Sequence, residues 1–290
     1  MTSGSNGASA SPGRAGGAGG VGGVGPSHRG GSGEPLLCVH GITDTWRTWE
    51  LVLPALERRH DVLAITLHGH SGGRPLEREG EIELLDLVDE AERDMDAAGF
   101  ETAHLVGNSL GGWIVLELAA RGRARSVVAI CPAGGWDHGN RRALRAYWDL
   151  ILSQKALELA GPLAERFAAR PGLRKLAMAN LVSDPAAVPA GLAAALIRGA
   201  GECPAALPLL AQTRREGYPN VGRIECPVRI VWGSNDRLLP VKKLSERFRR
   251  MIPDADWAEI EGGGHLPQID HPARTAELIL EITAPVDAAA

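Results

Sequence analysis

The sequence predicts an α/β fold in which a mostly parallel central sheet is flanked by helices and carries an inserted helical segment. Short apolar runs alternate with segments of helical periodicity from residue 35 to about residue 131. The alternation stops between about residues 136 and 222, where Ala- and Leu-rich segments are broken by Gly and Pro and contain no β-branched runs. It resumes at residue 226. Alternating strands and helices are typical of a parallel sheet with helices on both faces.

The first half of the chain supplies four strands and three helices to this pattern. The strands are apolar runs without alternation, as expected where both faces of a sheet are covered. The helix at 84–98 shows one apolar stripe, and the helix at 110–122 is apolar nearly all round, so it should be deeply buried. The predicted strands are 35–40, 61–67, 102–106 and 125–131, and the predicted helices are 46–59, 84–98 and 110–122.

The second half continues in the same order after the insertion. Strands are predicted at 226–233 and 255–260, and helices at 240–251 and 273–282. The organisation is therefore a core built from 34–135 and 223–290, with a helical insertion at 136–222 between its parts. Residues 1–33 are dominated by Gly, Ala and Ser and have almost no large apolar side chains. This composition predicts a disordered tail whose removal leaves the folded part unchanged.

Composition and charge narrow the class of partner. The 290 residues are 44% hydrophobic and 23% charged, which is ordinary for a globular protein. A formal net charge of −4 gives no electrostatic reason to expect nucleic acid or an anionic membrane as a partner. We expect a small-molecule substrate, no nucleic acid and no membrane, and leave a homodimer open.

The four cysteines predict neither a disulfide framework nor a metal site. Cys38, Cys131, Cys203 and Cys226 show no C-x-x-C spacing and no His at zinc-ligand spacing. Buried, reduced thiols are typical of a cytoplasmic protein. The N-terminal segment also lacks the apolar stretch of a signal peptide. We expect no metal and no cofactor.

Two serines match the nucleophile signature G-x-S-x-G, and their surroundings distinguish them. Ser109 lies between a predicted strand and a helix that begins at once, with Gly107 and Gly111 on either side. A nucleophile at such a turn needs small neighbours and the amides of a helix N-terminus. Ser71 also follows a strand, but Arg74-Pro75 and a polar run give no helix after it. Ser109 is the predicted nucleophile.

A serine hydroxyl needs a base, and the base needs a carboxylate. His265 lies in the Gly-rich segment EGGGHLPQ, after the last strand and before the last helix. Asp236 lies in the turn that follows the strand at 226–233. Both positions are at the carboxyl edge of the predicted sheet, where sites of open parallel sheets gather. Taken singly, His265 could be a solvated loop residue and Asp236 a turn-former, but together with Ser109 they predict a triad.

The order Ser109, Asp236, His265, the glycine-flanked turn and the alternating pattern resemble the α/β-hydrolase superfamily, from residue 35 to about 283. The resemblance implies an α/β-hydrolase fold with a helical cap. The His40-Gly41 pair is similar to the oxyanion loop of that superfamily, which implies backbone N–H donors at Ile42 and Leu110. The resemblance also implies that His40 and Gly41 lie beside the substrate. The segment around Ser71 resembles a structural loop of the same superfamily.

These residues predict acyl transfer, with hydrolysis of a carboxylic ester or lactone of a small hydrophobic molecule as the first hypothesis. Superfamily members that open epoxides or remove halide have Asp as the nucleophile in the glycine-flanked turn, called the nucleophile elbow, so Ser109 argues against both reactions. Hydrolysis of carbon–carbon bonds in vinylogous diketones is an alternative, because GNSLGG and PAGG resemble that subgroup. Two features depart from the pattern of that subgroup. The segment HGITDT lacks the subgroup's extra glycines in the oxyanion loop, and Leu266 follows His265 at a position where the subgroup usually has Trp. A cofactor-free perhydrolase and a receptor-like ligand-binding protein are further alternatives.

The insertion should set the choice of substrate. Trp136, Tyr147 and Trp148 could line an apolar pocket, or could be core residues at helical spacing; Trp136 and Trp148 are the candidates for substrate contact. Arg141, Arg142 and Arg145 could meet a substrate carboxylate, although such a cluster is more often a solvated face.

Overall fold

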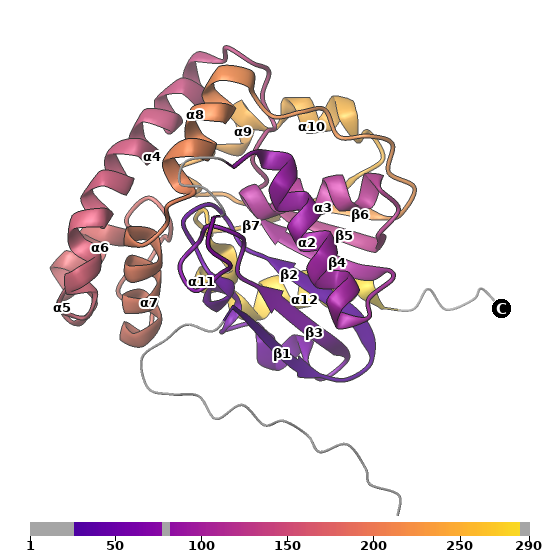
Figure 1. Cartoon of the computed structure of the whole chain (residues 1–290), viewed down its shortest axis with the longest axis horizontal. Coiled ribbons are helices and arrows are strands. Elements are labelled where there is room, and N and C mark those ends of the chain that lie inside the picture. Colours follow the sequence, from indigo (N-terminus) through magenta and orange to yellow (C-terminus); the bar gives the residue numbers. More distant parts are fainter. Residues whose placement is uncertain (1–25, 77–81, 285–290) are drawn as a thin grey trace, which may run out of the picture.

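A computed structural model describes residues 26–76 and 82–284, and in these ranges seven strands form one sheet (Figure 1). The strand order is β1-β3-β2-β4-β5-β6-β7, with β2 to β7 parallel and β1 antiparallel to β3. The strands are β1 (Ser27–Gly31), β2 (Glu34–Val39), β3 (His60–Ile65), β4 (Ala103–Asn108), β5 (Ala124–Ile130), β6 (Val228–Gly233) and β7 (Asp256–Ile260).

Helices cover both faces of this sheet (Figure 1). Helix α2 packs against α3 on one face, and α1 packs against α12 on the other. The core helices of the described chain are η1 (Trp46–Trp49), α1 (Leu53–Leu56), α2 (Leu84–Ala98), α3 (Leu110–Ala120), α9 (Val241–Leu244), α10 (Glu246–Met251), α11 (Pro267–Asp270) and α12 (Pro272–Thr283). The mostly parallel sheet and its flanking helices are those of the predicted fold class.

The apolar runs of the sequence become the interior of the sheet. Every residue of β4 is buried, and so are the four residues Leu36–Val39 of β2. Helix α3 is buried on nearly all its sides, since it lies between the sheet and α2. Continuous burial on both faces explains why these strands carry apolar residues without alternation. The central strands thereby form a rigid base whose carboxyl edge carries the loops described below.

The segment between β5 and β6 is helical throughout its regular parts. It packs over one end of the sheet, and α4 is its longest helix at 20 residues. Its elements are α4 (Arg141–Ala160), η2 (Gly161–Leu163), α5 (Ala164–Ala169), α6 (Pro171–Met178), α7 (Ala190–Gly201) and α8 (Ala206–Glu216). We call this segment the insertion.

Two predicted helices are broken in the structure. The helix expected at 46–59 consists of η1 and the short α1, with Pro54 in the first turn of α1. Proline has no N–H to donate and its ring crowds the preceding turn, so it starts a helix rather than continuing one. The helix expected at 240–251 is divided at Ser245, whose hydroxyl donates to the backbone oxygen of Val241 at 2.6 Å. Such side-chain bonds compete with the helical ladder.

The predicted tail boundary at residue 33 is wrong, because Ser27–Gly31 forms the edge strand β1. This strand pairs with Asp61–Ile65, and Arg29 donates two hydrogen bonds to Asp61 at 3.0 and 2.7 Å. The glycines that favoured disorder are needed here: a Cβ on Gly31 or Gly33 would lie 2.2 Å from a backbone oxygen of the adjoining loop. Main-chain pairing, not apolar side chains, holds the strand. The rest of the predicted tail, residues 1–25, lies outside the described residues.

A chain that begins at Glu34 should therefore be less stable than one that begins at Pro26. Each kcal/mol lost lowers the melting temperature of a domain of this size by about 2–4 °C, so the loss of a paired strand should be measurable in thermal denaturation. Arg29→Ala in the longer chain removes an exposed ion pair and a cation–π contact with Phe100 but keeps the paired strand, and should have a smaller effect. Equal melting temperatures for the two truncations would contradict a stabilising role for β1.

Candidate active site

Ser109 occupies a strained turn between β4 and α3. Its backbone has φ 54° and ψ −115°, a region that non-glycine residues rarely adopt. The turn is held by hydrogen bonds on both sides, from Ser109 N–H to Ile130 O at 2.9 Å and from Ala133 N–H to Ser109 O at 2.9 Å. The surrounding structure therefore fixes the serine at the carboxyl edge of the sheet, beside the N-terminus of α3.

The positions on either side of Ser109 must be glycine, because neighbouring backbone atoms lie too close to leave room for a side chain. A Cβ on Gly107 would lie 2.1 Å from the backbone oxygen of Gly111, and one on Gly111 would lie 2.2 Å from that of Val39. Distances this short exclude any side chain without a backbone shift. Ser71 has no such surroundings: it lies in the loop after β3, where its hydroxyl donates to Glu202 at 3.0 Å. Ser71 is also not among the residues that line the pocket described below.

His265 and Asp236 meet as a buried pair. The ring nitrogen Nδ1 of His265 lies 2.8 Å from Asp236 Oδ2, and both side chains are almost fully enclosed. Asp236 Oδ1 accepts hydrogen bonds from the backbone of Leu238 at 2.9 Å and of Leu239 at 2.7 Å. Burial alone would raise the pKa of Asp236, but the charge and hydrogen bond of His265 with these donors hold it below its ordinary value. The carboxylate therefore remains ionised and directs a proton to Nδ1.

The other ring nitrogen of His265 is free to accept. Its Nε2 atom is buried and has no hydrogen-bond partner among the described residues. The Gly-rich loop that carries the ring is held by Asn108, which donates to His265 O at 3.0 Å, and by Asp270, which accepts from Gly264 N–H at 2.7 Å. Asp270 also accepts from Ser183 N–H of the insertion at 2.9 Å, so the loop is fixed from both sides.

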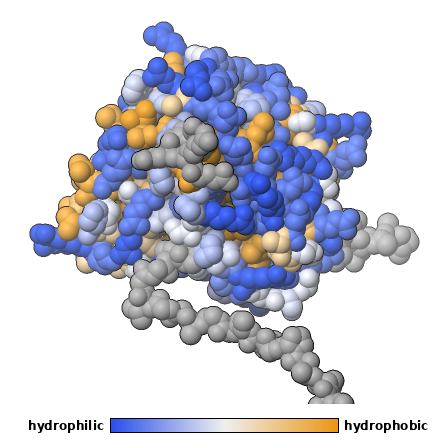
Figure 2. Space-filling view, viewed as in Figure 1, coloured by the Kyte–Doolittle hydropathy of each residue, from blue (hydrophilic) through white to orange (hydrophobic). Residues whose placement is uncertain are grey.

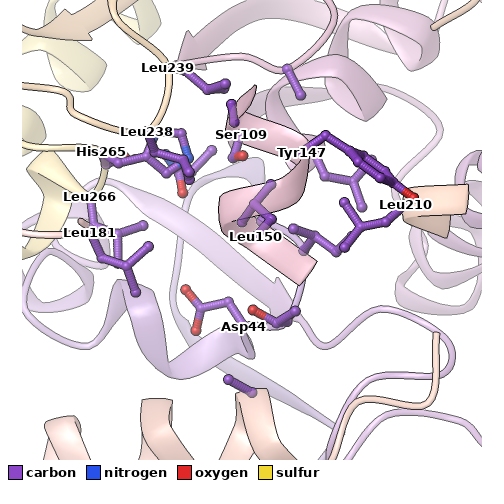
Figure 3. Close-up of a pocket in the computed structure, with 18 of the residues that line it drawn as sticks. Asp44, Ser109, Tyr147, Leu150, Leu181, Leu210, Leu238, Leu239, His265 and Leu266 are labelled. Carbon is purple, nitrogen blue, oxygen red and sulfur yellow. The ribbon is translucent and has the colours of Figure 1, made fainter. Parts of the chain in front are cut away.

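Ser109 and His265 line one cavity of about 110 Å³ between the core and the insertion (Figure 3). Its walls are mainly apolar side chains from α4, α7 and the loops after β6 and β7. The space exceeds severalfold what one water needs, so a small acyl group fits. Ile42 and Leu110 also line it, and within the described chain no acceptor is found for either backbone N–H. Two unpaired N–H groups beside a serine can bind an oxyanion.

The predicted contact residue Gly41 lies at the cavity, whereas the prediction for His40 is wrong. A Cβ on Gly41 would lie 3.0 Å from Ser109 Cβ, so the loop runs against the serine. The His40 ring is fully buried and does not line the cavity. Its Nδ1 donates to Gly41 O at 2.7 Å and its Nε2 accepts from Leu67 N–H at 2.9 Å, while burial keeps its pKa well below the ordinary value. His40 is a neutral brace of this loop.

Trp136 lines the cavity, but the prediction for Trp148 is wrong. Trp148 is 50% exposed on the outer side of α4, with the Arg214 guanidinium 5.3 Å from its ring centre. Neighbouring residues on a helix point about 100° apart, and Tyr147 is the one that faces the cavity. Asp137, the other acid near this edge, is exposed and pairs with Arg250 at 2.7 Å, so it does not contact His265.

Sequence reasoning missed Asp44, the only Asp or Glu among the described residues that line the cavity. Its carboxyl group lies across the cavity from Ser109 (Figure 3), is 8% exposed and accepts from Thr45 N–H at 2.8 Å. Burial raises the pKa of Asp44 to about 7, although nearby His265 lowers it. The only signal in the sequence is its place three residues after the His40-Gly41 pair.

Comparison with known proteins identifies the family. The profile of the alpha/beta hydrolase family matches residues 36–278, most of the chain. The chain belongs to the alpha/beta hydrolase family. A hydrolase of this family, an epoxide hydrolase of Mycobacterium tuberculosis, is 35% identical over 195 residues, 67% of this chain and 91% of the relative. The 2-hydroxymuconate semialdehyde hydrolase of a Pseudomonas species is 30% identical over 276 residues, 91% of each chain.

A solved structure of the alpha/beta hydrolase fold agrees with this assignment. The carboxylesterase of Bacillus subtilis superposes with a TM-score of 0.66 at 18% identity, covering 89% of this chain and 87% of its own. At that identity the likeness concerns the fold alone.

This alpha/beta hydrolase brings three potential metal ligands together that sequence spacing did not predict. Ligand atoms of Cys131, Asp236 and His265 lie within 4.8 Å of one another, and all three residues are buried. They come from the ends of three different strands, so no local motif reveals them. The carboxylate oxygens of Asp236 already accept from His265 and from two backbone N–H groups, and the Cys131 thiol donates to Gly264 O. Hydrogen bonding therefore accounts for this cluster.

The pKa of Asp44 predicts a pH-dependent stability. In the folded state the Asp44 carboxyl group keeps its proton up to about pH 7, whereas in the unfolded chain it releases the proton at about pH 4. Stability from this group is thus present below about pH 4 and is lost as pH rises to about 7, by up to about 4 kcal/mol. Asp44→Asn should be more stable than wild type at about pH 8 and close to it at about pH 4.

Chemical denaturation at a series of pH values measures this difference. The Asn side chain can still accept from Thr45 N–H, so the local hydrogen bond is matched. A difference between the two proteins that does not change with pH would show that Asp44 ionises normally.

Proposed function

We propose that this protein is a serine hydrolase that cleaves neutral carboxylic esters or lactones of small hydrophobic molecules. One observation carries the proposal: the buried, unpartnered Nε2 of His265 faces the cavity of Ser109, while Nδ1 is held by Asp236. An imidazole fixed in this tautomer can take the proton of a serine hydroxyl.

The reaction follows from these positions. Ser109 Oγ attacks the ester carbonyl carbon as its proton moves to His265 Nε2, and the carbonyl oxygen becomes an oxyanion that the N–H groups of Ile42 and Leu110 stabilise. The carbon–oxygen bond then breaks, His265 returns the proton to the leaving alkoxide, and an acyl-serine remains. Water, deprotonated by His265, attacks the acyl carbon; the bond from that carbon to Ser109 Oγ then breaks, His265 returns the proton to Oγ, and the acid is released. Asp236 stabilises the imidazolium in both halves.

Ser109 at the turn between β4 and α3 weighs against epoxide opening, the activity in the name of one relative. A carboxylate that attacks an epoxide carbon forms an ester, which water can cleave at its carbonyl carbon. Serine would form an ether instead, which offers no carbonyl for water to attack. Ser109 therefore suits substrates that already contain a carbonyl group, such as esters and lactones.

The charge of the cavity favours neutral substrates. Among the described residues that line it there is no Lys or Arg, and Asp44 is its one acid. A substrate carboxylate would enter a largely apolar space without a counter-ion and close to another carboxyl group, which is costly. An uncharged acyl chain fills the same space with apolar contacts. The arginines considered from the sequence, Arg141, Arg142 and Arg145, do not line the cavity.

Carbon–carbon bond hydrolysis is the second candidate, favoured by the 30% identity with the 2-hydroxymuconate semialdehyde hydrolase along 91% of both chains. Like ester hydrolysis, it needs a base and an oxyanion site. The acid at Asp44 and the absence of a basic residue in the described cavity wall weigh against acidic diketone substrates. Perhydrolysis would use the same acyl-enzyme with peroxide in place of water.

Ser109→Ala should keep the fold and lower kcat for p-nitrophenyl butyrate by roughly 10⁴–10⁶-fold, because the nucleophile of the triad is removed. An organophosphonate should label Ser109 in the wild type and not in the variant. Release of p-nitrophenol and mass spectrometry of the labelled peptide make the two measurements.

Ser71→Ala is the matched control, since it stands in the other G-x-S-x-G match and should retain nearly full activity. If Ser71→Ala were the inactive variant, the elbow assignment would be wrong. An intact wild type that binds small apolar esters without turnover would instead indicate a ligand-binding protein.

Substrate charge should matter more than size. At about pH 8, kcat/KM for p-nitrophenyl butyrate should exceed that for the p-nitrophenyl monoester of succinic acid by at least about tenfold, because the second ester buries a carboxylate opposite Asp44. Asp44→Asn should narrow this ratio while retaining turnover of the neutral ester. A preference for the charged ester, or faster cleavage of a vinylogous diketone acid, would favour the second candidate.

A further inference from the structure

Helix α4 is apolar on two sides, and only one of them faces the cavity. Its cavity side contributes Ala143, Ala146, Tyr147, Leu150 and Leu157. On its other side four large apolar residues are exposed to solvent: Leu144 at 39%, Trp148 at 50%, Leu152 at 67% and Leu159 at 82%. Their spacing of four and seven residues places them on one line along the helix. We call these four residues the outer apolar strip.

The strip continues beyond α4. Leu163 in η2 and Leu176 in α6 are 48% and 75% exposed. Hydrophobic side chains gather along the edge of the molecule that the insertion forms (Figures 1 and 2). Single exposed leucines are ordinary, but a line of them with a tryptophan along a 20-residue helix marks an interaction surface.

Basic residues surround the strip. Residues 141–179 contain eight Arg or Lys and three Asp or Glu, in a chain whose net charge is −4. Arg141, Arg145 and Lys155 lie on the same side of α4 as the strip, by their spacing from Trp148. The acids pair with Arg145, Lys155 and Arg198.

Several of the remaining cations are uncompensated. Within residues 141–179, all of which the structure describes, the five cations that are exposed and make no ion pair are Arg141, Arg142, Arg166, Arg170 and Lys175. Arg214, stacked on Trp148, adds a further positive charge beside the strip. The face is therefore both apolar and electropositive.

We propose that the outer apolar strip and its basic surroundings bind the surface of a bilayer that contains anionic phospholipids. A helix with Leu and Trp on one side and Arg or Lys beside them lies in the interface, with its apolar side chains below the headgroups. Basic residues near an anionic surface add about 1 kcal/mol each. No helix among the described residues is long and apolar enough to cross a membrane. The binding proposed here is peripheral.

A second copy of the chain fits this face less well. Two copies packed through α4 would bring the basic residues of each face toward those of the other, because few acids are available there to pair with them. Anionic headgroups supply the opposite charge. The sequence alone predicts no membrane partner, because the net charge is −4. That sum does not show that basic residues gather on one face of the molecule.

The same helix joins the surface to the cavity. The side of α4 that lines the cavity and the side that would contact lipid are thus two faces of one helix. Vesicle binding does not require ester hydrolysis, so this proposal can be tested independently of the proposed function.

Sedimentation of the full chain with vesicles tests the proposal. Wild type should bind vesicles of phosphatidylcholine with about 30% phosphatidylglycerol and should bind phosphatidylcholine alone far more weakly. Leu152→Glu/Leu159→Glu should reduce binding by more than about tenfold, since two charges would enter the apolar layer. Arg141→Gln/Arg145→Gln should weaken it by about fivefold for each residue, with reduced sensitivity to salt.

The matched control is Leu85→Glu on α2, at a leucine that is 44% exposed and lies outside the insertion. It should bind vesicles as wild type does, and all variants should cleave a water-soluble ester equally because none of these residues lines the cavity. Equal binding to neutral and anionic vesicles, or equal loss with Leu85→Glu, would overturn the proposal. So would unchanged vesicle binding by the strip variant together with conversion of a dimer to a monomer in light scattering.

Discussion

The close approach of three backbone segments around Ser109 is the constraint on which the rest of the site depends. Gly107 in β4 touches Gly111 in α3, and Gly111 in turn touches the end of β2 at distances that no Cβ permits. This contact holds Ser109 at φ 54° and sets Gly41 of the neighbouring loop against it. The strain at one residue is tolerated because two strands and a helix, all buried, over-determine its position. Ile42 and Leu110, whose N–H groups have no acceptor among the described residues, line the cavity next to this contact.

The parts of the fold and site that the sequence predicted are those whose position is determined by the topology of the sheet. Carboxyl ends of parallel strands meet at one edge of a sheet, so a residue that directly follows a strand can be placed without knowing its side-chain direction. Ser109, Asp236 and His265 are of this kind, and the structure brings them to one edge. The two serine motifs are separable for the same reason: a helix begins at once after Ser109, whereas in the described part of the chain the next helix after Ser71 begins at Leu84.

The predictions fail where the position of a group depends on the direction of a side chain or on backbone pairing. His40 and Trp148 were each placed near the site correctly along the chain, but one ring turns into the core to brace two loops and the other turns to solvent. Asp44 was missed because its place after the His40-Gly41 pair is its only signal, and nothing local in the sequence predicts that its carboxyl group is buried. The edge strand β1 was missed because it is held by main-chain bonds and glycine contacts, which leave no apolar pattern to detect.

Helix α4 shows how one element can give the molecule two environments of opposite charge. Its inner side completes an apolar cavity in which Asp44 is the one Asp or Glu among the described lining residues, and its outer side presents cations beside exposed apolar residues. On the two proposals above, an anionic lipid headgroup would be attracted to the outside of the insertion and disfavoured inside it. If both proposals hold, the two preferences act in series: the surface collects the protein at an anionic bilayer, and the cavity accepts the neutral esters dissolved there while leaving the charged headgroups outside. The selectivity of the enzyme would then come from the separation of charge across a single helix.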